Sequence, residues 1–109
     1  MKFKISNSKL EQVVFIYLDN KNFIIKETPT NYYFMENDTD EYSKIVFNKI
    51  STNCYVVYKL LEELELFFSL DRPDVLNFLK NYVENVLGIV VRKVFWRARP
   101  NDWMFKVVD

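Results

Sequence analysis

The order of two kinds of hydrophobic pattern constrains the fold of this chain most. Three short β-type runs, at residues 23–27, 32–36 and 42–48, are separated by the turn 28–31 and the polar loop 37–41. Such short runs between turn residues are typical of an antiparallel meander. Two helical patterns and a further β-type region follow. Strands grouped before and after a pair of helices indicate an α+β fold, with helices on one face of a mainly antiparallel sheet.

Apolar residues recur at helical spacing in three segments. The first covers about residues 8–19, the second about 58–68, and the third runs from Asp71 towards Gly88. Gly88 stands where a left-handed C-terminal cap is expected, and Pro73 suits the first turn of the same helix. Residues 54–58 indicate a fourth strand that leads directly into the second helix. The alternating residues 2–5 are consistent with one more short strand.

The C-terminal region is expected to form a β-hairpin. Residues 89–96 have a strand pattern, Pro100 and Asn101 provide turn signals, and residues 103–108 return as a second strand. The predicted order is an N-terminal helix, a β-meander, two helices and a C-terminal β-hairpin. We expect all 109 residues to form a single α+β domain.

The composition excludes most common catalytic and cofactor chemistries. The chain has no histidine, one cysteine (Cys54) and one glycine (Gly88). Histidine is the usual proton shuttle near neutral pH, and a phosphate-binding loop needs several glycines. The loop 37–41 is acidic but lacks the glycine and the terminal glutamate of a calcium loop. We therefore expect neither an enzyme nor a cofactor or metal site.

The balanced charge predicts no strong non-specific attraction to nucleic acid or to an anionic membrane. Fifteen basic and fifteen acidic residues give a formal net charge of zero. The N-terminal residues lack the apolar core of a signal peptide, and no apolar run is long enough to span a membrane. One cysteine cannot form an internal disulfide, which fits a reducing compartment. We expect a cytoplasmic protein that does not bind membranes.

The C-terminal region carries the residues that indicate binding. Residues 89–109 contain five basic and two acidic side chains and both tryptophans of the chain. Arginine and tryptophan are frequent in the energetic centres of protein interfaces, and they also stack on nucleic-acid bases. The alternative is that the tryptophans close the core and the arginines form a solvated rim. The candidate partner-binding residues are Arg92, Phe95, Trp96, Arg97, Arg99 and Trp103.

The opening segment MKFKISNSKLEQVVFIYLDN and the segment YKLLEELELFFSLDRPDVLNFLKNYVENVLGIVVRKV carry a resemblance to a known class of proteins. The junction 68–71 and the step 82–84 resemble those of small α+β accessory proteins of tailed bacteriophages. This resemblance implies a short N-terminal helix before a meander, and a phage-encoded protein that acts in the host cytoplasm. A long terminal hairpin with two tryptophans departs from that class, and the resemblance assigns no functional residues.

These observations lead to one functional hypothesis and two alternatives. The first is a non-catalytic protein-interaction module, a phage accessory protein that binds a host or virion protein through the C-terminal hairpin. The second is a small nucleic-acid-binding protein that uses the same surface. The third is a homo-oligomer in which the terminal strand pairs between subunits.

Overall fold

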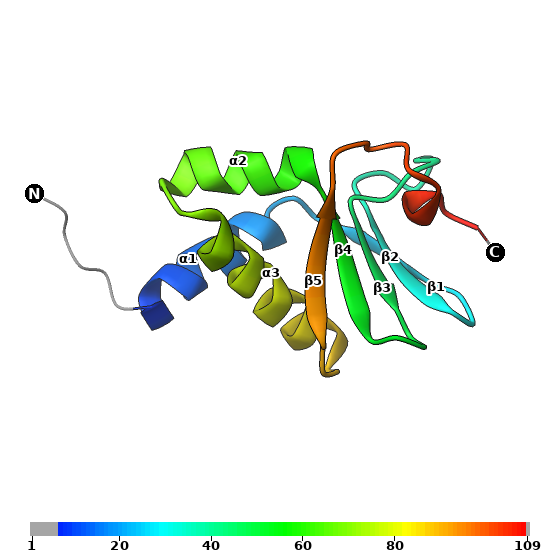
Figure 1. Ribbon diagram of the computed structural model, residues 1–109, viewed down its shortest axis with the longest axis horizontal. Helices are drawn as coiled ribbons and strands as arrows, with labels where there is room; N and C mark the ends of the chain where they lie inside the picture. Colours follow the sequence, from blue (N-terminus) through cyan, green and yellow to red (C-terminus); the bar gives the residue numbers. More distant parts are fainter. Residues whose placement is uncertain (1–6, 109) are drawn as a thin grey trace, which may run out of the picture.

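The computed structural model describes residues 7–108 and contains one five-stranded sheet in the order β1-β2-β3-β4-β5 (Figure 1). In chain order the elements are α1 (Asn7–Asp19), β1 (Ile24–Glu27), β2 (Asn31–Met35), β3 (Ile45–Asn48), β4 (Asn53–Val57), α2 (Tyr58–Phe68), α3 (Arg72–Leu87), β5 (Lys93–Arg97) and the short 3-10 helix η1 (Trp103–Phe105). The strand predicted for residues 2–5 lies outside the described residues.

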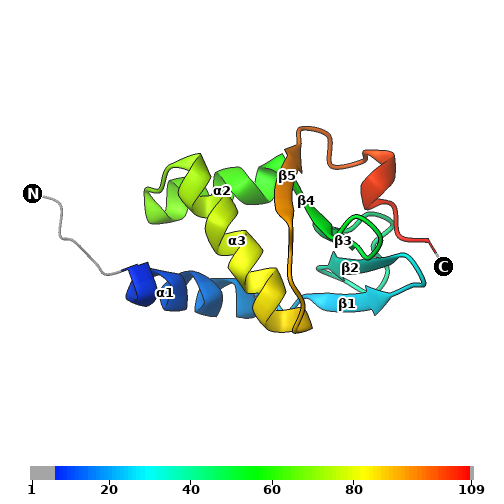
Figure 2. The same ribbon diagram turned by 60° about the horizontal axis from the view of Figure 1, so that its bottom comes forward.

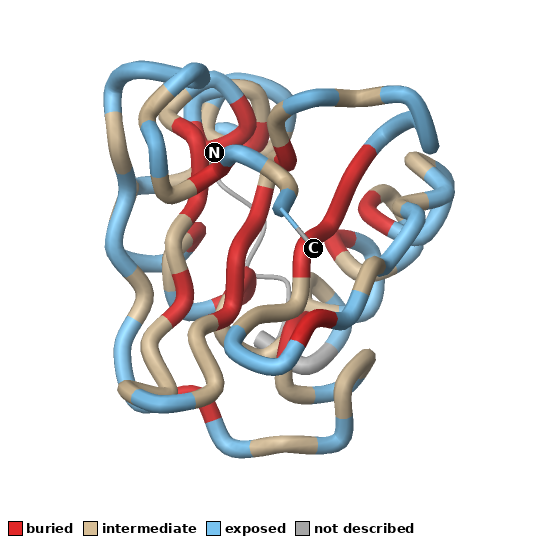
Figure 3. Tube along the Cα trace, turned by 90° about the vertical axis from the view of Figure 1, so that its right-hand side faces the viewer, coloured by how far each residue is buried: buried red, intermediate tan, exposed pale blue. Residues whose placement is uncertain are grey.

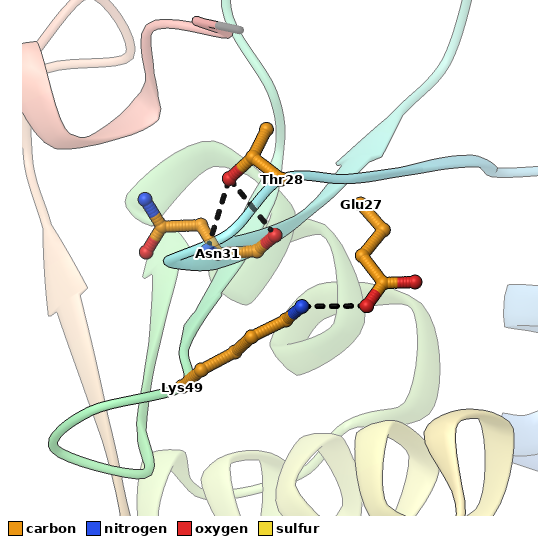
Figure 4. Close-up of polar contacts among 4 residues, drawn as sticks. All are labelled: Glu27, Thr28, Asn31 and Lys49. Carbon is orange, nitrogen blue, oxygen red and sulfur yellow. Dashed lines mark hydrogen bonds and ion pairs between the residues drawn. The ribbon is translucent and has the colours of Figure 1, made fainter.

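The first three strands form the predicted antiparallel meander, and the predicted fourth strand extends it as β4. Each strand of this group pairs with the next one in the chain. The turn between β1 and β2 is closed by Thr28, whose hydroxyl accepts a 3.0 Å bond from the Asn31 amide (Figure 4). Beside it, Lys49 forms an ion pair with Glu27. Residues 28–30 all have a negative φ, so this turn does not need glycine.

The predicted C-terminal hairpin is wrong, because β5 pairs with β4 and not with the residues that follow β5. α2 begins directly after β4, and α2 and α3 together form the crossover that brings β5 back beside β4. β5 pairs with β4 in parallel, with Cys54 opposite Val94 and Val56 opposite Trp96. The predicted partner of this strand, residues 103–108, forms no strand against it. A crossover of two helices is long enough for parallel pairing, which a short turn cannot provide.

The residues after β5 cross the face of the sheet that lies opposite the helices. We call residues 98–108 the C-terminal segment. Phe105 in this segment is fully buried, and its carbonyl oxygen accepts bonds from the Ser43 amide (2.7 Å) and the Ser43 hydroxyl (3.0 Å). One isolated bridge joins Tyr42 to Lys106. Figure 3 looks onto this side of the molecule, where buried strand residues lie beneath the segment. Because Phe105 is buried against the sheet, the residues after β5 cross the sheet and do not form the predicted hairpin with β5.

All three helices lie on one side of the sheet (Figure 2). Alternate strand residues point towards them: Phe34, Ile45 and Val56 are partners across β2, β3 and β4, and all three are fully buried. Leu61 on α2 and Leu79 on α3 are also fully buried. The α+β class with a mainly antiparallel sheet is therefore confirmed, and the main core lies between the sheet and the helices.

The helix ends show how one glycine suffices for this fold. Gly88 ends α3 with φ of 66° and ψ of 36°, and its amide bonds to the Glu84 carbonyl at 2.8 Å. The cap predicted at this residue is confirmed. Ser69 ends α2 in the same left-handed region, with φ of 52°. A residue with a Cβ is less stable there than glycine, and the Ser69 amide closes this second cap with a bond to the Glu65 carbonyl. Among the described residues, no helix combines the length and apolar character needed to cross a bilayer.

Candidate interaction surface

The strand β5 distributes the predicted site residues over two faces of the sheet. Successive residues of a strand point to opposite sides. Phe95 and Arg97 share the face that the C-terminal segment crosses, because they are partners of Tyr55 and Val57. Trp96 is the partner of Val56 and therefore points to the helix side. We call the face opposite the helices the open face.

Aromatic and basic side chains stack along the open face. The rings of Phe95 and Tyr55 are stacked, with centroids 5.6 Å apart and an interplanar angle of 24°. The Arg97 guanidinium lies 5.3 Å from the Tyr55 ring centroid, within the range of a cation–π interaction. Its Nη1 also donates a 3.1 Å bond to the Trp96 carbonyl. These contacts hold Arg97 and Phe95 in defined positions at the surface.

A groove of about 460 Å³ separates this stack from the C-terminal segment. Its floor comes from the strands, and its wall comes from η1 and the residues that follow. Trp103 is 81 % exposed although it lines this groove. The complete lining is Asn31, Tyr33, Val46, Asn48, Tyr55, Arg97, Trp103, Met104, Lys106 and Val108. The groove offers flat aromatic surface, amide groups and positive charge to a ligand.

The strand residues that alternate onto the open face carry three basic side chains, Lys26, Lys93 and Arg97, and no acidic one. Acidic groups lie beside the C-terminal segment. Glu41 lies 3.6 Å from the Lys106 amine, and Asp40 borders a hollow together with Pro100 and Asn101. The surface is therefore basic on the strands and acidic beside the C-terminal segment.

Trp96 belongs to a separate cluster on the helix side. Its ring centroid lies 5.2 Å from that of Tyr58, and the Arg72 guanidinium lies 5.0 Å from it. Arg72 also pairs with Glu65 at 3.4 Å, which raises the pKa of the guanidinium. Trp96 thus joins β5 to the starts of α2 and α3, while its own side chain stays 36 % exposed.

The six predicted site residues fall into three groups. Phe95, Arg97 and Trp103 lie on or beside the open face, Trp96 lies behind it, and Arg92 and Arg99 are exposed at the two ends of β5. The sequence pattern did not indicate the groove residues Tyr33 and Tyr55. Their strands were predicted, but the alternation of Tyr32–Met35 and of Asn53–Val57 does not tell which face the helices cover.

The groups with displaced pKa values have structural roles. Cys54 is fully buried under the helices, and this burial raises the pKa of its thiol, so it packs as a small apolar residue. Tyr17 donates a short hydrogen bond to the Glu63 carboxylate, which raises the pKa of Tyr17 to about 12. Burial of Glu63 is outweighed by bonds from Lys21, at 2.6 Å, and from Tyr17, so its pKa lies below the usual range. These contacts join α1 to α2.

Within residues 7–108, no three carboxylate or thiol groups come together in an arrangement that could hold a metal ion. The sequence matches no protein-family model, and searches of curated proteins and of solved structures find no similar protein.

Proposed function

We propose that this protein is a non-catalytic protein-interaction module that binds its partner with β5 and the groove of the open face. The observation that carries this proposal is the fixed array of Phe95, Tyr55 and Arg97 beside the exposed Trp103. Aromatic side chains and arginine provide most of the energy in many protein interfaces. Because ring stacking already holds Phe95 and Arg97 in place, binding orders few additional side chains.

The charge pattern favours a protein over a nucleic acid as the partner. A polyanion bound along the C-terminal segment would approach Asp40 and Glu41. A protein partner can match both signs of charge. With the phage resemblance, we propose a virion or host protein as the partner and the cytoplasm as the place of action, where the buried thiol of Cys54 stays reduced.

One observation favours a second candidate function, the binding of single-stranded nucleic acid. The open face presents Tyr55 and Phe95 together with basic side chains and no acidic strand residue. Sheets with exposed aromatic rings can stack bases, and basic residues neutralise the backbone. Binding of this kind weakens steeply with salt.

Peptide selection tests the proposed function. Immobilised wild-type protein selects binders from a library of random displayed peptides, and each recovered peptide is titrated against purified protein by fluorescence. We expect the double variant Phe95→Ala, Trp103→Ala to bind them at least about tenfold more weakly. The matched control is Val13→Ala, Ile16→Ala, which removes exposed apolar side chains from α1 and should bind as the wild type does.

Two results would overturn this proposal. One is that every selected peptide binds the double variant as tightly as the wild type. The other is that only an oligonucleotide binds, such as a 15-nucleotide oligothymidylate whose affinity falls about tenfold or more between 50 and 200 mM salt. That second result would establish nucleic-acid binding instead.

A further inference from the structure

β5 is the last strand of the sheet, and among the described residues no strand pairs with its outer side. In Figures 1 and 2 the whole length of β5 is visible, with no other element drawn across it. An edge strand of this kind presents free backbone N–H and C=O groups, and these can pair with an extended segment of another chain. β5 is therefore a place where a sixth strand can be added.

The side chains of β5 are suited to contact such a strand on both faces. Phe95 and Trp96 point to opposite sides of the sheet, and each is 36 % exposed. Aromatic side chains on an edge contribute to cross-strand pairs with the residues placed opposite them. An added strand would therefore gain apolar contacts on the open face and on the helix side at once.

The charges of β5 select the kind of strand that can pair. Lys93 and Arg97 lie on the same face, two residues before and after Phe95, and Arg92 and Arg99 follow at either end. No acidic residue occurs between Glu84 and Asp102. Four residues of a strand span about 13 Å. An extended peptide with carboxylates at positions i and i+4 therefore matches Lys93 and Arg97.

The same charges disfavour a second copy of this chain as the added strand. A two-fold symmetric antiparallel pair centred on Phe95 would place Lys93 opposite Arg97 twice. Like charges directly opposite each other destabilise a pair of strands. Charged edge residues are a known device against such self-association.

We propose that the outer edge of β5 binds an extended acidic protein segment as a sixth strand, with carboxylates opposite Lys93 and Arg97 and an apolar residue opposite Phe95. This inference rests on the proposed function as a protein-interaction module and specifies the chemistry of the partner. The spacing i, i+2, i+4 is the same in both directions, so it serves a parallel or an antiparallel partner.

A labelled peptide with the palindromic core Glu-Val-Tyr-Val-Glu, capped at both ends, tests the proposal by fluorescence anisotropy at 50 mM salt. The double variant Lys93→Glu, Arg97→Glu should bind it about tenfold more weakly than the wild type and should bind the core Lys-Val-Tyr-Val-Lys about tenfold more tightly. The control Lys9→Glu, Lys80→Glu changes the net charge equally on α1 and α3, outside β5 and the groove of the open face, and should bind as the wild type does.

A second probe separates strand pairing from general charge attraction. The acidic peptide with N-methyl groups on its two valines and its tyrosine keeps its carboxylates but loses backbone donors on both edges. We expect its affinity to fall at least about tenfold. Circular dichroism checks the fold of each variant, and Lys93→Gln, Arg97→Gln replaces the reversed pair if that pair does not fold.

Three outcomes would overturn the edge assignment: equal binding of the N-methylated peptide, unchanged binding after charge reversal, or a dimer in light scattering that charge reversal dissociates. If one of them occurs while selected peptides still depend on Phe95 and Trp103, the edge assignment fails and the proposed function stands. If no selected peptide depends on those residues, the proposed function itself fails.

Discussion

The two faces of the sheet are built from alternate residues of the same strands, yet they have different covers. On the helix side, Phe34, Ile45 and Val56 are fully buried beneath the helix layer. On the open face, a single crossing segment covers the centre and leaves Phe95 and Trp103 in contact with solvent. Burial is therefore concentrated on one face, and the other face carries the exposed aromatic side chains of the proposed interaction surface.

The open face is nevertheless anchored. Tyr33 and Val46 are buried there, and Phe105 brings a fully buried ring from the C-terminal segment. The segment is held by few contacts, chiefly Phe105, its bonds to Ser43 and the bridge at Lys106. A region with few buried contacts opens locally at a lower free energy than the core does.

The largest effect should come from the helix side. Phe34→Ala removes a fully buried ring between sheet and helices and should lower the free energy of unfolding by about 3–5 kcal/mol. Urea denaturation followed by circular dichroism measures this loss. Phe95→Ala in β5 serves as the comparison on the open face, and a loss as large for Phe95 as for Phe34 would contradict the division between the faces.

Phe105→Ala should have the next largest effect, about 2–3 kcal/mol, because the ring is fully buried but its segment can detach without global unfolding. Hydrogen exchange gives the more specific measurement. The Val107 amide, which bonds to the Glu41 carbonyl at 2.9 Å, should lose its protection while strand amides of β2 and β3 keep theirs. Equal loss of protection in both regions would show that the segment is part of the main core.

The free energy of unfolding above pH 9 should depend on the burial of Cys54 on the helix side. Burial raises the pKa of this thiol above its ordinary value near 9, so the thiol ionises more readily in the unfolded chain. Its contribution to stability is complete below pH 9 and is lost as the pH rises above that value. One such group accounts for about 1 kcal/mol between pH 9 and pH 10.

The variant Cys54→Ala isolates this contribution. Its free energy of unfolding is lower at every pH, but it should decline less than that of the wild type between pH 9 and pH 10. The thiol of the folded wild type should also resist modification by an aromatic disulfide reagent. Rapid modification at pH 8 without unfolding would show that the helix layer does not exclude solvent from Cys54.

The tie between Ser43 and the C-terminal segment should contribute less. Ser43→Ala removes the hydroxyl that donates to the Phe105 carbonyl, while the backbone amide of residue 43 still donates to the same oxygen. The expected loss is about 0.5–1 kcal/mol, the usual net value of one hydrogen bond. A loss above 2 kcal/mol in urea denaturation would mean that the segment contributes more to stability than its few contacts indicate.

Local patterns in the sequence predicted the helix side well. The spacing of Leu60, Leu61 and Leu64 marks the buried face of α2, and all three residues are buried. Gly88 marks the end of α3 because few other residues adopt its backbone conformation readily. Phe67 continues the same apolar spacing but is 65 % exposed, because it lies in the last turn of α2, where its ring contacts those of Tyr17 and Phe68. Periodicity places a residue on a helix face without telling where the covering layer ends.

The open face could not be predicted from such local patterns. The partner of β5 is β4, which precedes it by about forty residues, and no turn residue signals a pairing at that distance. Pro100 and Asn101 do indicate a turn, but the chain after it is directed by the burial of Phe105 against strands formed much earlier. As a result the two tryptophans, seven residues apart, were expected in one hairpin and lie in different environments.

Trp103→Ala should have the smallest effect on stability. This variant is also the most direct test of the difference between the helix side and the open face. A side chain that is 81 % exposed buries little area in the folded protein, so its removal should change the free energy of unfolding by less than about 0.5 kcal/mol. A large aromatic ring kept in solvent beside a groove gains its contacts only when a partner covers it. The same variant should therefore weaken the peptides selected on the wild type. If Trp103→Ala instead destabilises the protein by 2 kcal/mol or more, its ring belongs to the anchor of the C-terminal segment and the recognition surface shrinks to β5.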